Sequence, residues 1–177
     1  MGISTRGVIP VAHKDSVHYA TMNYRTIWAV LDHLALGPSD VLVDVGCGKG
    51  RVLCCAARYP VGRVVGVDLS EPLCEIARAN ARRMRGRRAP IFVETTFADD
   101  FDYSDATVLF LFDPFGAATL GNVLEKVGRE VRGEIRIAYA SPVHEVVFEQ
   151  QPWLELTERW DATTLDMEHS IAFYRRT

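Results

Sequence analysis

The sequence predicts an α/β fold, a three-layer sandwich whose seven-stranded sheet is mostly parallel and ends in a C-terminal antiparallel hairpin. Short apolar, β-branched runs alternate with helical patterns through most of the chain, as in parallel sheets covered by helices. A glycine-rich turn joins the first such run to the next helix. The last two runs follow each other without a helix, which implies an antiparallel pair because a parallel crossover needs about a dozen residues or more.

The N-terminal part divides into an arm and the first helix of a single domain. Residues 1–18 show no clear period, so we expect an arm there and one domain over residues 19–177. From residue 19 to 36 the apolar side chains recur at helical spacing, which predicts an amphipathic helix. Gly37 and Pro38 then end it.

The remaining elements follow in a regular alternation. Strands are predicted where apolar and β-branched residues cluster, at residues 41–45, 64–67, 91–96, 107–112, 134–140, 154–159 and 170–174. Helices are predicted at residues 50–58, 70–83, 117–131 and 143–149. Ser70 can cap the helix that it begins, and Pro72 suits the first turn of that helix.

Length and composition limit the possible classes of protein. A chain of 177 residues with 48% hydrophobic and 24% charged residues is typical of one globular domain. Its formal charge of −3 does not favour a nucleic-acid partner, and no apolar run is long enough for a membrane span. The four cysteines contain no C-x-x-C pair, so we expect buried free thiols, no metal site and a cytoplasmic location. The oligomeric state stays open.

The segment D-V-G-C-G-K-G has Asp44 near the end of the first strand and Gly46, Gly48 and Gly50 in the turn that follows. Glycines at alternate positions let the backbone turn sharply and let a ligand lie against main-chain atoms. Asp68 ends the second strand, where a carboxylate can accept hydrogen bonds from the two hydroxyls of a ribose. These positions predict a nucleoside across the strand ends.

The spacing of the glycines distinguishes between dinucleotides, other phosphate-bearing nucleotides and S-adenosylmethionine (SAM), which can all bind across strand ends. A dinucleotide fingerprint is G-x-G-x-x-G, whereas this loop is G-x-G-x-G, and the chain has no G-x-x-x-x-G-K-[ST] phosphate loop. The carboxylate of Asp44 would repel a pyrophosphate but could engage the amino group of a methionine moiety. Charge and spacing therefore favour SAM.

With this loop, acid and terminal hairpin, the sequence resembles the class I, seven-stranded SAM-dependent methyltransferases over residues 19–177. The resemblance implies that the loop contacts the methionine part of SAM and that the acid ending the second strand holds the ribose. The cofactor-binding residues that it implies are Asp44, Gly46, Cys47, Gly48, Gly50 and Asp68, with Leu69 beside the adenine. The alternative for the glycine segment is a tight turn from strand to helix without a ligand. The alternative for Asp68 is an acid that the dipole of the following helix favours.

At the end of the third strand the family usually places an acid near the adenine amino group. Here Thr96 and Phe97 occupy that position, and Asp99 comes slightly later. Phe97 could pack on the adenine face and Asp99 could bond its amine. Alternatively, they are a core aromatic residue and a solvated turn acid.

The segment L-F-D-P-F-G after the fourth strand is the candidate catalytic site, because ligands of open α/β sheets bind outside the carboxyl ends of the strands. Asp113 could orient an acceptor amine or take its proton. Pro114 could direct backbone carbonyls at that amine, and the ring of Phe115 could hold it by cation–π contact. The segment resembles the [DNS]-P-P-[YFW] motif of amino-directed methyltransferases, with Phe115 in place of the second proline and Gly116 in place of the aromatic residue. Alternatively, the segment is a turn that leads into the helix at residue 117, with Asp113 as a cap.

The D-x-G-C-G-K-G-R-V-L opening and the aromatic end of the fourth strand resemble the seven-stranded protein-lysine methyltransferases. The leading hypothesis is therefore a SAM-dependent N-methyltransferase that acts on a protein lysine or a small amine. The alternatives are a small-molecule or nucleic-acid methyltransferase and a catalytically silent SAM-binding partner subunit. The histidines are interpreted as surface or packing residues. Tyr19 and Tyr24 could close over SAM, with packing on the helix face as the alternative. The arginine-rich run at 82–88 is interpreted as a helix end and a solvated loop, with binding of an acidic partner as the alternative.

Overall fold

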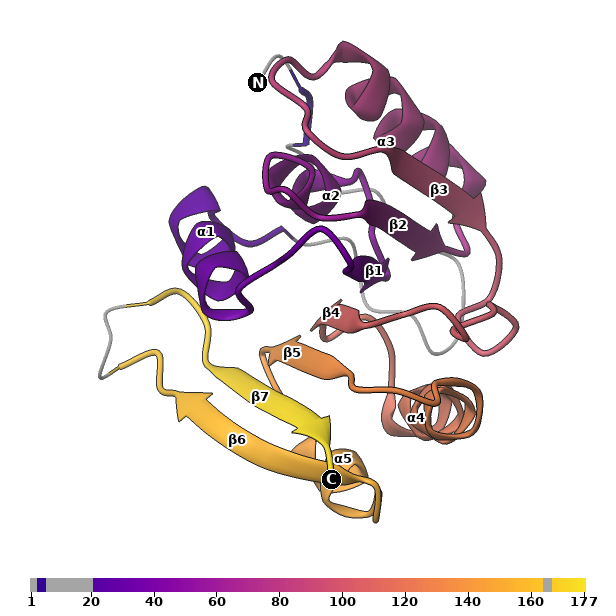
Figure 1. Ribbon diagram of the computed structural model, residues 1–177, viewed down its shortest axis with the longest axis vertical. Coiled ribbons are helices and arrows are strands. Elements are labelled where there is room, and N and C mark those ends of the chain that lie inside the picture. The colour runs from indigo at the N-terminus through magenta and orange to yellow at the C-terminus, as the bar shows by residue number, and fades with distance from the viewer. Residues whose placement is uncertain (1–2, 6–20, 164–166) are drawn as a thin grey trace.

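The computed structural model describes residues 3–5, 21–163 and 167–177, and its centre is one seven-stranded sheet (Figure 1). The strands are β1 (Val41–Val45), β2 (Arg63–Asp68), β3 (Ile91–Thr95), β4 (Val108–Phe112), β5 (Arg136–Ala140), β6 (Leu154–Trp160) and β7 (Ile171–Arg176). Their order in the sheet is β3-β2-β1-β4-β5-β7-β6.

The strand directions confirm the predicted sheet. Strands β1 to β5 are parallel, β7 is antiparallel to β5, and β6 is antiparallel to β7. The order reverses between β1 and β4, and open α/β sheets bind ligands beyond the carboxyl ends of the strands at such a reversal. The topology therefore places the candidate site above β1, β2 and β4.

Helices cover both faces of the sheet. They are α1 (Tyr24–His33), α2 (Arg51–Ala56), α3 (Glu71–Arg83), α4 (Ala117–Glu130) and α5 (Glu145–Glu149). Helices α1 and α2 pack on one face with strand residues such as Leu42 and Phe110, whereas α4 and α5 pack on the other with Val43 and Leu109. Since successive strand residues point to opposite faces, both sides of the central strands are buried. Figure 1 shows α3 beside α2 and β3.

The first helix differs most from its prediction. It begins at Tyr24 rather than at residue 19, because Asn23 caps it and accepts the Thr26 backbone N–H through Oδ1 at 2.8 Å. Residues 19 and 20 lie outside the described part of the chain. Helix α2 is also shorter than predicted and ends at Ala56.

The four cysteines are buried and unpaired, as predicted. Burial raises the pKa of the Cys54 thiol to about 11 and that of Cys55 to about 12, so both stay neutral at physiological pH. No helix in the described ranges is both long enough and apolar enough to cross a membrane.

Candidate functional site

The loop between β1 and α2 has a backbone conformation that glycine adopts without strain. Gly46, Gly48 and Gly50 have φ values of 77°, 51° and 74°, all in the left-handed region. The N–H groups of Gly46 and Cys47 both donate to the Val67 carbonyl on β2, at 2.8 and 3.0 Å. These bonds hold the loop over the carboxyl end of the neighbouring strand.

Asp68 at the end of β2 supports the same loop with its side chain. Its Oδ2 accepts the Gly48 N–H and its Oδ1 accepts the Ser70 N–H, both at 2.9 Å. Each carboxylate oxygen can accept a second bond, so capacity remains for a ligand hydroxyl. Burial raises the pKa of this carboxyl, while the two backbone donors oppose the rise. Leu69 follows, half-buried.

The Asp44 carboxyl is buried beside the loop. The residue is 4% exposed, and no described residue donates a hydrogen bond to its side chain. Burial, followed by the charge of Asp68, raises the pKa of Asp44 to about 8. A cation stabilises a buried carboxylate, and the ammonium group of a methionine moiety is such a cation. The residues at this position therefore fit SAM.

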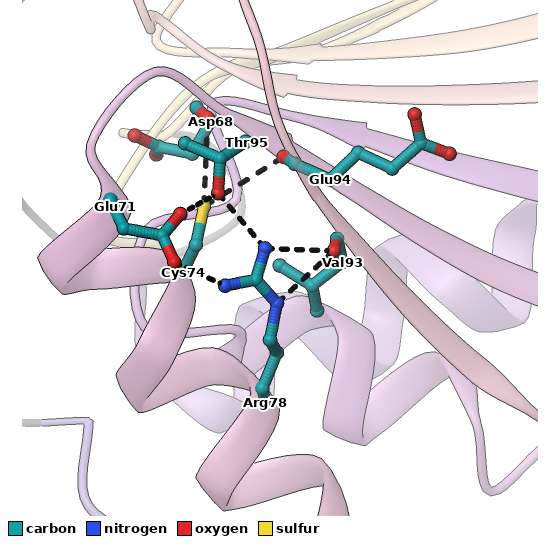
Figure 2. Close-up of polar contacts among 7 residues, drawn as sticks. All are labelled: Asp68, Glu71, Cys74, Arg78, Val93, Glu94 and Thr95. Atoms are coloured by element: carbon teal, nitrogen blue, oxygen red, sulfur yellow. Dashed lines mark hydrogen bonds and ion pairs between the residues drawn. The ribbon is translucent and has the colours of Figure 1, made fainter.

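The Cys47 side chain turns away from the loop and into the core. A Cβ on Gly66 of β2 would lie 2.8 Å from Sγ of Cys47, which shows how closely the thiol packs under that strand. A hydrogen bond to Cys74, together with burial, raises the pKa of Cys47 well above its usual value. Cys74 in turn donates to the Asp68 carbonyl at 3.5 Å (Figure 2). The loop thus presents the backbone of Cys47, not its thiol.

A polar cluster fixes the carboxyl end of the edge strand β3 to α3 (Figure 2). The Arg78 guanidinium donates to the Val93 carbonyl at 3.2 and 3.3 Å and to the Thr95 hydroxyl at 2.9 Å. It also forms an ion pair with Glu71 at 2.8 Å, and the Thr95 hydroxyl donates to the same carboxylate. The cluster sets the position from which the chain continues towards Phe97.

The turn after β3 carries Phe97 and Asp99 next to the end of β2. The Thr96 N–H donates to the Asp68 carbonyl at 3.1 Å, which ties this turn to the neighbouring strand. Phe97 is 48% exposed, so it is not a core aromatic residue. Asp99 is half-buried, and its charge adds to burial in raising the pKa of Tyr103. Both residues therefore lie at the same edge of the sheet as Asp68.

The D-P-F segment lies against the glycine loop. A Cβ on Gly46 would be only 2.5 Å from the Cβ of Pro114. Asp113 has a φ of 37°, a left-handed value that is uncommon outside glycine and that clusters at functional sites. The Tyr139 hydroxyl donates to Oδ1 of Asp113 at 3.0 Å and accepts the His144 N–H at 3.2 Å. No described residue donates to Oδ2 of Asp113.

Phe115, which the sequence suggests as an acceptor-binding ring, is buried in the core. It is 7% exposed and packs in the core cluster on the α4 face, together with residues such as Leu111 and Leu120. Burying a phenylalanine ring contributes about 2 kcal/mol, which favours this position directly before a helix that covers the sheet. The ring is therefore part of the core, while Asp113 and Pro114 remain half-buried at the edge.

The end of β5 lies beside the end of β4, and Ser141 there was not among the predicted site residues. Ser141 follows β5, precedes Pro142 and has a left-handed φ of 50°. Its Oγ lies 2.9 Å from Nδ1 of His169, and the His169 ring packs edge-on against Phe112 with 4.7 Å between centroids. His169 is therefore a packing residue, as the sequence indicated, but one placed at the candidate site. The residue-proline pairs that end β4 and β5 are the signal that points to this place.

Arg51, the residue after Gly50, was also missed by the sequence analysis. It donates to the Thr5 hydroxyl at 2.9 Å and to the Met22 carbonyl at 2.7 Å. Its guanidinium lies over the Tyr24 ring, 4.7 Å from the centroid. Tyr24 thus packs on the start of α2, while Tyr19 lies outside the described residues.

Asn80 holds part of the expected N-terminal arm against the glycine loop. It is 1% exposed within α3 and both accepts from the Ser4 N–H at 2.9 Å and donates to the Ser4 carbonyl at 3.0 Å. It also donates to the Lys49 carbonyl at 2.9 Å. A polar residue at an apolar position of a helix was the sequence signal for this contact.

The chain matches the protein family described as methyltransferase domain over residues 42–132, more than half of its length. A protein-lysine N-methyltransferase of Saccharolobus islandicus (strain REY15A) is 27% identical over 161 residues, which cover 89% of this chain and 92% of that protein. A ribosomal protein L11 methyltransferase of Cupriavidus necator is 30% identical over 122 residues, but these cover 69% of this chain and 40% of that protein.

A solved structure is similar over nearly the whole fold. An RNA methyltransferase from Salinibacter ruber in complex with S-adenosyl-L-homocysteine has a TM-score of 0.68 at 21% identity, covering 89% of this chain and 93% of that one. The names of these proteins give different acceptors, and the matched residues 42–132 of this chain include the glycine loop, Asp68 and Asp113. The chain therefore belongs to the methyltransferase domain family and is a class I SAM-dependent methyltransferase.

Proposed function

We propose that this enzyme methylates an amine nitrogen, and that the amine is the side chain of a protein lysine. The close approach of Gly46 and Pro114 carries the proposal, because it joins the acceptor segment to the loop that would hold the methionine part of SAM. When bound, SAM supplies an electrophilic methyl group on a sulfonium sulfur. The chain then has to hold an uncharged amine in line with that methyl group.

Asp113 is the residue that we expect to bind the amine. Tyr139 occupies Oδ1 of Asp113, so Oδ2 can accept an amine N–H. The nitrogen that gains the methyl group becomes positively charged, and the Asp113 carboxylate can take the proton that this nitrogen loses. Pro114 fixes the backbone at this point, while Phe115 supports the segment from the core.

The cofactor contacts belong to the same proposal. Asp44 would pair with the amino group of SAM, and Asp68 would accept the ribose hydroxyls through its remaining lone pairs. Around them we place Gly46, Cys47, Gly48 and Gly50 at the methionine part, and Leu69, Phe97 and Asp99 at the adenine.

A protein acceptor is favoured by the relatives. The Saccharolobus protein-lysine N-methyltransferase is similar along nearly its whole length. The name of the Cupriavidus relative also gives a protein as its acceptor, although the present chain covers a smaller part of it.

The test is methyl transfer by the full chain from tritiated SAM to a lysine-rich protein, to the same protein with its lysines chemically blocked, to RNA and to small amines. We expect labelling of the unblocked protein, with the methyl group assigned to lysine by mass spectrometry. Asp113→Asn should lower turnover at least about tenfold while SAM affinity is kept. The matched control is Glu125→Gln, an exposed carboxylate on α4.

Equal labelling of the blocked protein, or labelling of RNA alone, would overturn the lysine assignment. Full turnover by Asp113→Asn would remove Asp113 from the mechanism. Silence towards every acceptor despite SAM binding would favour a catalytically inactive partner subunit.

A further inference from the structure

We propose that an arginine patch at the amino edge of the sheet binds the phosphate backbone of single-stranded nucleic acid. The arginine patch consists of six exposed residues, Arg58, Arg82, Arg83, Arg85, Arg87 and Arg88. They come from the chain just after α2, from the last turn of α3 and from the loop that leads to β3. This binding activity goes beyond methyl transfer and does not depend on it.

The arginine patch is not neutralised by the protein around it. Within the described ranges none of its members forms an ion pair with a carboxylate, whereas Arg63, Arg78 and Arg136 each do. The sequence has 20 basic and 23 acidic residues, so the 14 basic residues outside the patch leave the rest of the chain with a formal charge of −9. A positive surface on an otherwise acidic protein attracts polyanions locally.

The backbone of the loop that carries the patch is fixed. The N–H groups of Arg88 and Ala89 both donate to the Ala57 carbonyl at the end of α2, at 2.7 and 3.2 Å. Nη1 of Arg58 donates to the Arg85 carbonyl at 3.4 Å, which ties the two parts of the patch together. Guanidinium groups on an ordered backbone lose less freedom on binding than those of an unstructured tail.

The patch lies at the opposite edge of the sheet from the glycine loop. Helices α2 and α3 start at the carboxyl ends of β1 and β2 and return, so their C-terminal ends lie near the amino ends of β2 and β3. Strands of five or six residues span about 17–20 Å between the two edges. A ligand on the patch therefore leaves Asp113 accessible to its acceptor.

The chemistry of the patch fits phosphate. All six residues are arginines, whose planar guanidinium stays charged and pairs with phosphate oxygens through two parallel N–H donors. Phe92 lies on the edge strand β3, four residues after Arg88, and is 52% exposed. Unpaired bases stack on exposed aromatic rings beside basic groups, which favours single-stranded nucleic acid over an acidic peptide. The sequence alone favoured a solvated helix end, because neither the missing ion pairs nor the exposure of Phe92 is visible in it.

The experiment is fluorescence anisotropy with the full chain and labelled single-stranded RNA and DNA of the same mixed sequence. We expect saturable binding of either strand that weakens as salt is raised. Arg85→Gln, Arg87→Gln and Arg88→Gln together should weaken binding at least about tenfold and reduce the slope of log Kd against log salt by about 2. Phe92→Ala should weaken binding several-fold.

The matched control replaces three exposed arginines outside the patch, Arg25, Arg129 and Arg132, by glutamine and so changes the net charge equally. Equal weakening by the control and patch variants would overturn the proposal, as would undetectable binding by the unaltered protein. Displacement of the strand by polyglutamate as effectively as by unlabelled RNA would assign the patch to acidic proteins instead. The patch variant should keep full methyl transfer, so loss of nucleic-acid binding and failure of the proposed acceptor are separate outcomes.

Discussion

The Cβ of Pro114 lies 2.5 Å from the place where a Cβ on Gly46 would be. Since Gly46 also has a left-handed φ of 77°, Gly46→Ala should meet both a steric overlap and backbone strain. We expect a loss of about 1–3 kcal/mol in the free energy of unfolding, measured by urea denaturation. SAM affinity should fall as well, because Pro114 or the loop has to move. Gly133→Ala is the control, since nothing lies within 4 Å of its Cβ position, and equal stability of the two variants would contradict the expected overlap.

Asp44→Asn should stabilise the free protein at alkaline pH. The Asp44 carboxyl has an ordinary pKa of 3.8 and a folded-state pKa of about 8, so between these values the folded state keeps a proton that the unfolded state has lost. The stability that this group contributes is therefore complete below about pH 4, declines as pH rises and is lost above about pH 8. The difference in denaturation midpoint between wild type and Asp44→Asn should grow between about pH 4 and pH 8 and then level off. A constant difference would show that Asp44 is already ionised at pH 5.

Cofactor binding should release a proton from Asp44 below about pH 8. An ammonium group favours the carboxylate and lowers its pKa, so SAM affinity should rise as pH increases from about 6 to 8 and then level off. Isothermal titration calorimetry in two buffers of different ionisation enthalpy measures the proton. Asp44→Asn should bind SAM more weakly and release none. Unchanged proton release in that variant would place the titrating group elsewhere.

Tyr139→Phe should lower turnover without lowering SAM affinity. It removes the donor to Oδ1 of Asp113 and the acceptor of the His144 N–H, and we expect it to cost about 1 kcal/mol in unfolding free energy. Tyr174→Phe is a matched control, because Tyr174 also stacks on Phe148 and its hydroxyl also bonds a carboxylate, away from Asp113. Equal effects of the two variants on turnover would assign Tyr139 to packing alone.

Arg78→Lys should loosen the carboxyl end of β3. Lysine keeps the charge but cannot donate to Val93, Thr95 and Glu71 in one plane. Hydrogen exchange measured by mass spectrometry should become faster over residues 91–97. Arg63→Lys serves for comparison, since Arg63 forms an ion pair with Asp105, an exposed carboxylate at the other end of the sheet. Unchanged exchange in Arg78→Lys would mean that pairing with β2 alone holds the strand.

The order of strands and helices could be predicted because each depends on local patterns. Apolar runs indicated the strands, and the missing helix between β6 and β7 indicated the antiparallel pair. The start of α1 was misplaced because the apolar period continues past Asn23, whereas the hydrogen bond of that side chain to Thr26 decides where the helix begins.

The candidate site was predictable only where its residues lie at or just after the carboxyl ends of strands. Asp44, Gly48 and Asp68 meet because the carboxyl ends of parallel strands share one edge. Arg51 and Asn80 could not be placed from the sequence, because their partners belong to a segment far away along the chain. Ser141 was missed because nothing in its local sequence indicates that its hydroxyl meets His169, 28 residues further along the chain.

Asp68 accepts the backbone N–H groups of Gly48 and Ser70 before any cofactor arrives. Its carboxylate therefore orders the loop before the cofactor binds, and a ligand meets a loop whose conformational entropy has already been reduced. Removing this one side chain should consequently both slow capture and shorten the residence time of the cofactor, since part of the binding energy would be diverted into ordering Gly48.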